Sequence, residues 1–141
     1  MKVLSIKEPF ATLIKEKTKQ IETRSWKTSY RGELYIHASS AKVSKAFYKE
    51  RPEVIKLIKN HDYSYGNIIC KCKLVDCIKM TSPWIERLKK ENPKEYLCGY
   101  YEVNRYAWIL EEIEILDCPI PVKGRLGIWN FSEQDEKKDK L

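Results

Sequence analysis

Residues 19–39 read KQIETRSWKTSYRGELYIHAS, and this stretch decides the fold. Polar and apolar residues alternate from Ile21 to Trp26, which predicts a half-buried strand with Glu22 and Arg24 on one face. Residues 30–32, Tyr-Arg-Gly, predict a turn. Residues 33–38 follow with strong β propensity. We therefore expect two strands of the same sheet on either side of a short connection.

The rest of the chain adds strands and helices in an irregular order. Upstream, Val3 to Ile6 predicts a strand, and Pro9 suits the first turn of a helix that ends by Lys19. Further strands are predicted at 66–79, 106–116 and 126–131, and helices after Ser39 or Ser40, from Pro52 and at 82–90. About five strands with helices inserted between them favour an α+β fold, a mixed β-barrel with peripheral helices, over a parallel α/β sheet.

Length and composition indicate a single globular domain. The chain has 141 residues, 43% hydrophobic and 33% charged, which suits one core rather than two. We expect that domain over residues 1–131. Residues 132–141 are nearly all polar or charged, and we expect a flexible tail there.

Positive charge is concentrated near the N-terminus. The net charge is +7, and residues 1–31 hold eight basic residues against three glutamates. This asymmetry predicts an anionic partner near this segment, such as RNA or a nucleotide, although surface lysines that only aid solubility explain it equally well.

The cysteines and the hydropathy pattern favour a cytoplasmic protein without a metal or cofactor. The chain has five cysteines, and an odd number does not fit a disulfide scaffold. Together with the lack of a leader sequence, this favours a reducing compartment. Cys70 and Cys72 lack the spacing of a zinc site and are expected in the core. No run of 18 apolar residues exists, so we expect no membrane span.

A cluster of polar and aromatic residues is the strongest candidate site. Lys19 and Arg24 suit a phosphate, Glu22 suits an exocyclic amine, and aromatic rings nearby could stack on a base. The candidate ligand-binding residues are Lys19, Glu22, Arg24, Trp26, Tyr30, Arg31 and His37. The alternative is an ordinary same-face ion pair of Glu22 and Arg24, with Lys19 as a solvated loop residue.

The motifs around this cluster resemble the ASCH family. They are residues 4–11 (LSIKEPFA), Lys19-x-x-Glu22-x-Arg24-Ser25-Trp26, 30–39 (YRGELYIHAS), 106–111 (YAWILE) and 119–129 with its KGxxGIW ending. The family's pattern is Gly-x-Lys-x-x-Glu-x-Arg, and Lys17 replaces the glycine here. Because a lysine has no easy access to positive φ, we expect an altered turn or a longer helix, and thus a changed cleft.

The resemblance implies a PUA-like barrel with a cleft lined by Lys19, Glu22 and Arg24 that binds RNA. We therefore expect a nucleic-acid-binding module for single-stranded RNA or a modified nucleotide. Some bacterial ASCH members are acetylcytidine amidohydrolases with a catalytic lysine, threonine and glutamate, and their threonine stands where this chain has Glu22. A carboxylate cannot supply the same covalent step. The alternative is thus a hydrolase of an acylated nucleoside or RNA with Lys19 and Glu22 as the reacting pair, and a third possibility is an acidic protein partner.

Overall fold

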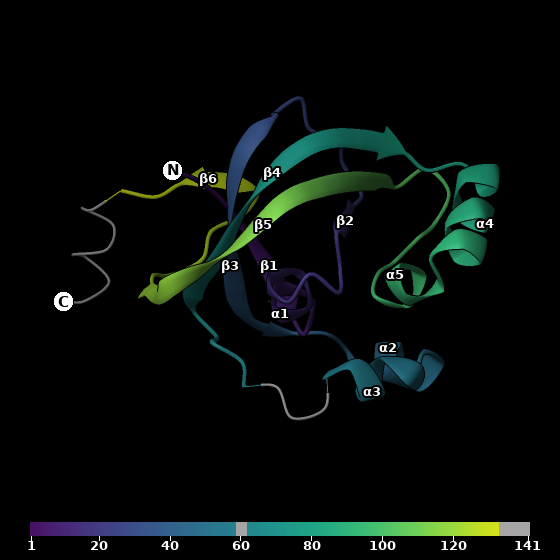
Figure 1. Ribbon diagram of the computed structural model, residues 1–141, viewed down its shortest axis with the longest axis horizontal. Coiled ribbons are helices and arrows are strands. Elements are labelled where there is room, and N and C mark those ends of the chain that lie inside the picture. The colour runs from purple at the N-terminus through teal and green to yellow at the C-terminus, as the bar shows by residue number, and fades with distance from the viewer. Residues whose placement is uncertain (59–61, 133–141) are drawn as a thin grey trace.

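A six-stranded mixed sheet forms the centre of the computed structural model, which describes residues 1–58 and 62–132. The strands are β1 (Lys2–Glu8), β2 (Ile21–Arg24), β3 (Gly32–Lys42), β4 (Asn67–Lys79), β5 (Tyr106–Pro121) and β6 (Ile128–Asn130). Their spatial order is β2-β5-β4-β3-β1-β6, with β1 and β3 parallel and the other neighbours antiparallel. The long strands β4 and β5 curve together across the molecule (Figure 1).

Five short helices surround the sheet within the described residues. They are α1 (Phe10–Lys15), α2 (Lys45–Glu50), α3 (Glu53–Ile58), α4 (Ser82–Glu91) and α5 (Pro93–Leu97). Three of them are N-capped by a side-chain oxygen. Ser44 accepts from the Phe47 amide, Thr81 from the Trp84 amide and Asn92 from the Glu95 amide. Figure 1 shows α4 and α5 together at one end of the sheet and α2 and α3 along its lower edge.

The main core lies between α1 and the sheet. Every residue from Phe10 to Ile14 is buried, and the apolar ones pack against side chains such as Leu34, Ile36 and Leu74 from β3 and β4. A smaller cluster joins Val3, Ile68, Val122, Trp129 and Phe131, so it fastens β6 and the end of β5 to β1. Burial of these apolar faces is the main force that holds the layers together.

The sheet remains open between its two edge strands, β2 and β6. No ladder pairs them among the described residues, so the predicted PUA-like barrel is not confirmed, whereas the mixed α and β architecture is. One side chain spans the opening: Nη2 of Arg24 in β2 donates to the Ser5 carbonyl in β1 over 2.8 Å. The curvature therefore brings β2 opposite β1 without a strand pairing.

The turn after α1 differs from the expectation for Lys17. The helix ends at Lys15, and Lys17 has φ of 67°, the left-handed conformation that a glycine would adopt. Amides after the helix hold it there: Lys17 donates to the Ile14 carbonyl, and Thr18 and Lys19 donate to the Leu13 carbonyl. The prediction of an altered turn or a longer helix is wrong, because these hydrogen bonds offset the steric cost of a lysine at positive φ.

Two boundaries also differ from the sequence prediction. Strand β3 continues to Lys42, so Ser39 and Ser40 lie in a strand, and Ser44 is the residue that begins α2. Strand β5 runs on to Pro121 through its pairing with Asn67 and Ile68. Of the predicted tail, only Ser132 lies within the described residues.

Candidate functional site

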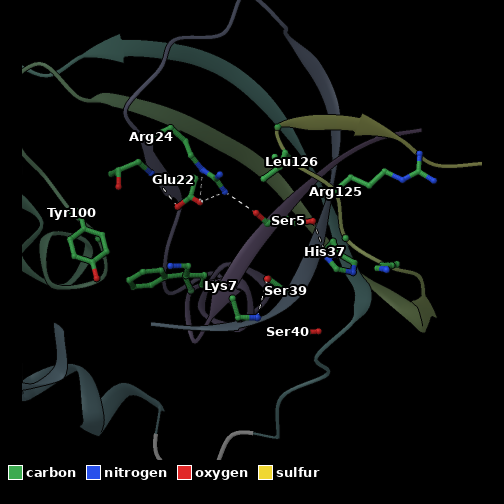
Figure 2. Close-up of a pocket in the computed structure, with 17 residues that line it drawn as sticks. Ser5, Lys7, Glu22, Arg24, His37, Ser39, Ser40, Tyr100, Arg125 and Leu126 are labelled. Carbon is green, nitrogen blue, oxygen red and sulfur yellow. Dashed lines mark hydrogen bonds and ion pairs between the residues drawn. The ribbon is translucent and has the colours of Figure 1, made fainter. Parts of the chain in front are cut away.

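A pocket of about 640 Å³ opens where β1, β2 and β3 face the loop between β5 and β6. We call it the Arg24 pocket. Figure 2 shows Glu22 and Arg24 on one side, His37 on another and Tyr100 at the far end. Its lining residues are Ser5, Lys7, Phe10, Glu22, Thr23, Arg24, His37, Ser39, Ser40, Ala41, Gly99, Tyr100, Lys123, Gly124, Arg125, Leu126 and Gly127.

The wall formed by β2 carries an oriented acid and base. Oε2 of Glu22 accepts from Nε and Nη2 of Arg24, at 3.2 and 3.0 Å, and its Oε1 accepts from the Thr23 amide. Glu22 is 6% exposed, and the Arg24 side chain is 25% exposed. The guanidinium is therefore fixed in place but still reachable, and its Nη1 makes none of these hydrogen bonds.

The opposite wall is a hydrogen-bonded chain through Ser5 and His37, which are register partners on β1 and β3. Because a carbonyl can only accept, Nε2 of His37 donates to Val122 O over 2.7 Å. On a neutral ring, Nδ1 then accepts from the Ser5 hydroxyl at 3.0 Å, and that hydroxyl accepts from Nε1 of Trp129 at 3.2 Å. The side chains of His37, Ser5 and Trp129 are thus linked by hydrogen bonds. Through its bond to Val122, His37 also fixes the start of the loop after β5.

Residues 123–127 form the outer wall, and we call them the 123–127 loop. A Cβ on Gly124 would lie 2.8 Å from Cε1 of His37 and 2.9 Å from Oγ of Ser5, so only glycine fits this approach. Gly127 has φ of 64°, which turns the chain into β6. The guanidinium of Arg125 lies 5.7 Å from the centre of the Trp129 ring.

The charge balance of the Arg24 pocket is positive. Its lining includes the basic residues Lys7, Arg24, Lys123 and Arg125, with Glu22 as the single carboxylate. Hydroxyl groups of Ser39 and Ser40 add neutral polar contacts. Cations from several strands and a loop around one hollow favour an anionic ligand.

Lys19 lies behind the Arg24 pocket, in contrast to its predicted place in the lining. It is 0% exposed, and its Nζ lies 3.9 Å from Oε2 of Glu95. The ammonium also lies 5.1 Å from the Phe10 ring centre and 5.9 Å from that of Tyr101. We call Lys19, Glu95 and Tyr101 the Lys19 cluster. The turn at Lys17 directs Lys19 toward α5, and so two of the three motif residues, not all three, meet in the pocket.

Burial dominates the electrostatics of the Lys19 cluster. It raises the pKa of Glu95 above its usual value, although the Lys19 ammonium, the Gln20 amide and the Tyr101 hydroxyl act in the opposite sense. The Gln20 amide donates to Oε1 of Glu95 over 2.5 Å, and the Tyr101 hydroxyl donates to Oε2 over 3.1 Å. Nζ of Lys19 makes no hydrogen bond to any described residue.

Three other predicted ligand-binding residues lie outside the lining. Trp26 packs edge-to-face on Trp108, and its carbonyl accepts from the Trp108 indole over 3.4 Å. The Tyr30 hydroxyl donates to the Glu33 carbonyl, and the exposed Arg31 donates to the Thr28 and Tyr30 carbonyls. Their side chains support the connection from β2 to β3.

Sequence reasoning missed Lys7, Ser39, Ser40, Tyr100 and the 123–127 loop as lining residues. Two signals pointed to that loop: glycines at 124 and 127, and cations at 123 and 125. They lie far along the chain from Glu22 and Arg24, so only the pairing of β6 with β1 brings them to the same hollow.

Other classes of site receive no support from the part of the chain that the structure describes. No group of three or more His, Cys, Asp or Glu residues there could hold a metal ion. All five cysteines are free thiols, and burial raises the pKa of Cys72 to about 12. No helix within residues 1–58 and 62–132 has the length and apolar character needed to cross a bilayer.

Known proteins are similar to this chain in sequence and in fold. It is 26% identical over 133 residues to human activating signal cointegrator 1 and 24% identical to the mouse protein, and the match covers 93% of this chain. The chain spans only 22% of the length of these relatives. The crystal structure of a mutant ASCH protein from Zymomonas mobilis has a TM-score of 0.56 with 13% identity, and the match covers 97% of this chain and 94% of that one.

A sequence model of the ASCH domain matches residues 4–119. The match includes most of β1, all of β2 to β4, most of β5 and the whole Lys19, Glu22 and Arg24 motif, and it stops before the 123–127 loop. Because it covers most of the sequence, the chain belongs to the ASCH domain family.

Proposed function

We propose that this chain binds single-stranded RNA or a modified nucleotide in the Arg24 pocket. The observation that carries the proposal is the charge of its lining, four cationic side chains against one carboxylate, around a volume that suits a nucleotide. A nucleotide needs contacts for both phosphate and base, and the hollow offers cations, hydroxyls and the aromatic rings of Phe10 and Tyr100.

Arg24 and Glu22 are the proposed recognition pair. Arg24 is held by Glu22 and Ser5, so its remaining N–H groups are oriented before a ligand arrives. Glu22 offers carboxylate oxygens next to that guanidinium, and an exocyclic amine could donate to them. A donor and an acceptor side by side suit a base edge, whereas Lys7, Lys123 and Arg125 suit phosphates.

The other predicted ligand contacts take different places in the proposal. His37 lines the hollow and fixes the 123–127 loop through Val122. Three predicted contacts lie outside the lining, where a longer RNA strand could reach them: Trp26, Tyr30 and Arg31. Trp26 is 39% exposed. Lys19 acts from behind, as a buried positive charge beside Gly99 and Phe10, which do line the pocket.

The hydrolase alternative gains no support from the geometry. Its reacting pair would be Lys19 and Glu22, but the ammonium of Lys19 faces Glu95 and does not line the pocket. Both carboxylate oxygens of Glu22 already accept hydrogen bonds, Oε2 from Arg24 and Oε1 from the Thr23 amide. We therefore propose binding, not turnover.

The test is RNA affinity as a function of salt. A fluorescent single-stranded RNA of about ten nucleotides should bind with a negative slope of log affinity against log salt. Replacing Arg24 and Lys123 together with alanine should weaken binding and flatten the slope by about 0.7 for each phosphate that the variant no longer neutralises. The matched control replaces Lys71 and Lys73, which pair with Glu114 and Glu112 on the outer sheet surface.

The control separates a site from general positive charge, because both double variants lose two cations. Equal weakening by the two pairs would show that the pocket is not the site. An acidic protein partner, the third possibility, would leave RNA affinity absent in the wild-type chain as well.

A further inference from the structure

Leu126 is the most exposed large apolar side chain of the described residues, at 97%, and yet it lines the Arg24 pocket. An isolated exposed leucine is ordinary on a protein surface and needs no explanation. This one differs because it stands at the rim of a concave, charged site. Figure 2 shows it between Arg24 and Arg125 at the mouth of that site.

The loop beneath Leu126 is held rigidly from both sides. Val122 is 4% exposed and its carbonyl accepts from His37, while Gly124 packs against His37 and Ser5 so closely that no side chain fits. On the other side, Ile128 pairs with Leu4, and Trp129 pairs with Val3. These contacts on both sides of Leu126 hold the backbone that carries it.

Two cationic residues precede Leu126 in the 123–127 loop. Lys123 and Arg125 line the same pocket, and Arg125 lies over the Trp129 ring. An apolar side chain beside cations that line the same pocket fits a ligand that carries both an apolar face and negative charges. A nucleobase with its adjoining phosphates has that chemistry.

We infer that Leu126 packs on the face of an unpaired base next to the nucleotide held in the Arg24 pocket, so the ligand is a single-stranded oligonucleotide rather than a lone nucleotide. This inference rests on the proposed function and adds a second base contact to it. In a duplex, both faces of an internal base are stacked, and an apolar side chain reaches them only by prising the stack apart. Unpaired bases of a single strand present a free face at no such cost.

The experiment compares wild type with Leu126→Ala on single-stranded RNA of about ten nucleotides, with Val103→Ala as the control. Val103 is also exposed, at 52%, and does not line the pocket. We expect Leu126→Ala to weaken RNA binding about threefold to tenfold, Leu126→Tyr to restore or exceed wild-type affinity, and Val103→Ala to change nothing. A thermal melt of each variant confirms equal folding.

Abasic substitutions identify the contact. Each RNA position in turn loses its base, and both proteins are measured against every oligonucleotide. At the position that Leu126 covers, the alanine variant should lose no further affinity once the base is absent, so the two changes are non-additive. Fully paired RNA should show no dependence on Leu126.

The outcomes separate the two proposals. Two results would overturn the leucine contact while Arg24-dependent binding stands. One is a change in RNA affinity below about twofold for Leu126→Ala, and the other is a loss of affinity that is additive with every abasic position. Leu126-dependent binding to phosphatidylserine vesicles without any effect on RNA also overturns it, in favour of a lipid surface. No RNA binding by wild type overturns the proposed function itself.

Discussion

Lys19 and Arg24 lie five residues apart in the sequence, and the acid–base pairs that they form have opposite environments. Arg24 and Glu22 are joined by two hydrogen bonds at the edge of a pocket, with the guanidinium a quarter exposed. Lys19 and Glu95 are both buried, 3.9 Å apart, and burial raises the pKa of the carboxyl. The pair at the pocket edge can exchange partners with a ligand, whereas the fully buried pair cannot do so without opening the core.

Lys19 and Arg24 belong to one sequence motif, but their different environments give them different roles. A planar guanidinium fixed by Glu22 and Ser5 suits recognition, because its geometry is set and its outer N–H groups face the pocket. A buried ammonium over the rings of Phe10 and Tyr101 contributes to folding and to the local potential. Substitutions should therefore separate stability from binding.

The largest expected effect is on stability, from Lys19→Ala. It leaves the buried Glu95 without its cation, and we expect the free energy of unfolding to fall by about 3–5 kcal/mol. Urea denaturation followed by circular dichroism measures this loss. The control is Lys15→Ala at the end of α1, which should change stability by less than about 0.5 kcal/mol. A Lys19→Ala variant as stable as the control would show that the ion pair does not support the fold.

Gly99→Ala should disturb both regions, because Gly99 lines the pocket and also contacts the Lys19 cluster. The added Cβ would lie 2.9 Å from Cε2 of Tyr101 and 3.0 Å from Nζ of Lys19. We expect a loss of about 1–3 kcal/mol from overpacking, measured by thermal unfolding. Gly66→Ala is the contrasting variant, because nothing lies within 4 Å of its Cβ and only its φ of 79° opposes it. Equal losses would mean that crowding against Tyr101 and Lys19 at position 99 costs no more than the backbone strain at position 66.

Arg24→Lys should affect binding more than stability. Lysine keeps the positive charge near Glu22 but loses the fork that bonds Glu22 and Ser5 together. We expect RNA affinity to fall about tenfold, which is about 1.4 kcal/mol, with a smaller change in unfolding free energy. Fluorescence anisotropy and denaturation on the same samples make the comparison. A variant that binds as wild type but unfolds easily would reverse the assignment of the two pairs.

The smallest expected effect is a pH slope from Glu95. Because its folded pKa is raised, the folded state holds this proton more tightly than the unfolded state does. Its contribution to stability is thus fully present below the usual carboxyl pKa of 4.5 and is lost as pH rises through the raised value. The difference in unfolding free energy between wild type and Glu95→Gln should change across that window. A constant difference would contradict the raised pKa.

Local sequence patterns predicted much of the sheet and part of the site. Alternation with a period of two placed Glu22 and Arg24 on one strand face, and the ion pair between them confirms it. Strand β4 was predicted within one residue, as was helix α4. The ASCH resemblance was also correct. Each of these depends on residues close together in the sequence.

Most of the errors concern contacts between distant residues. Nothing near Lys19 indicates that Glu95 will accept its charge, or that α5 will cover it. The 123–127 loop reaches the pocket only because β6 pairs with β1. At Lys17 the local preference against positive φ was overridden by amides bonded to α1. Tertiary pairing, which a single sequence does not display, decided the first two, and hydrogen bonds local to the end of α1 decided the third.

Ser5 connects Arg24, the proposed recognition residue, to the fluorescent side chain of Trp129. Its carbonyl accepts from Arg24, and its hydroxyl accepts from the indole of Trp129. A ligand that draws Arg24 away from that carbonyl will alter the surroundings of the indole N–H, to which tryptophan emission is sensitive. Occupancy of the site can therefore be followed by intrinsic fluorescence, with Trp129→Phe as the silent reference and no label attached to either molecule.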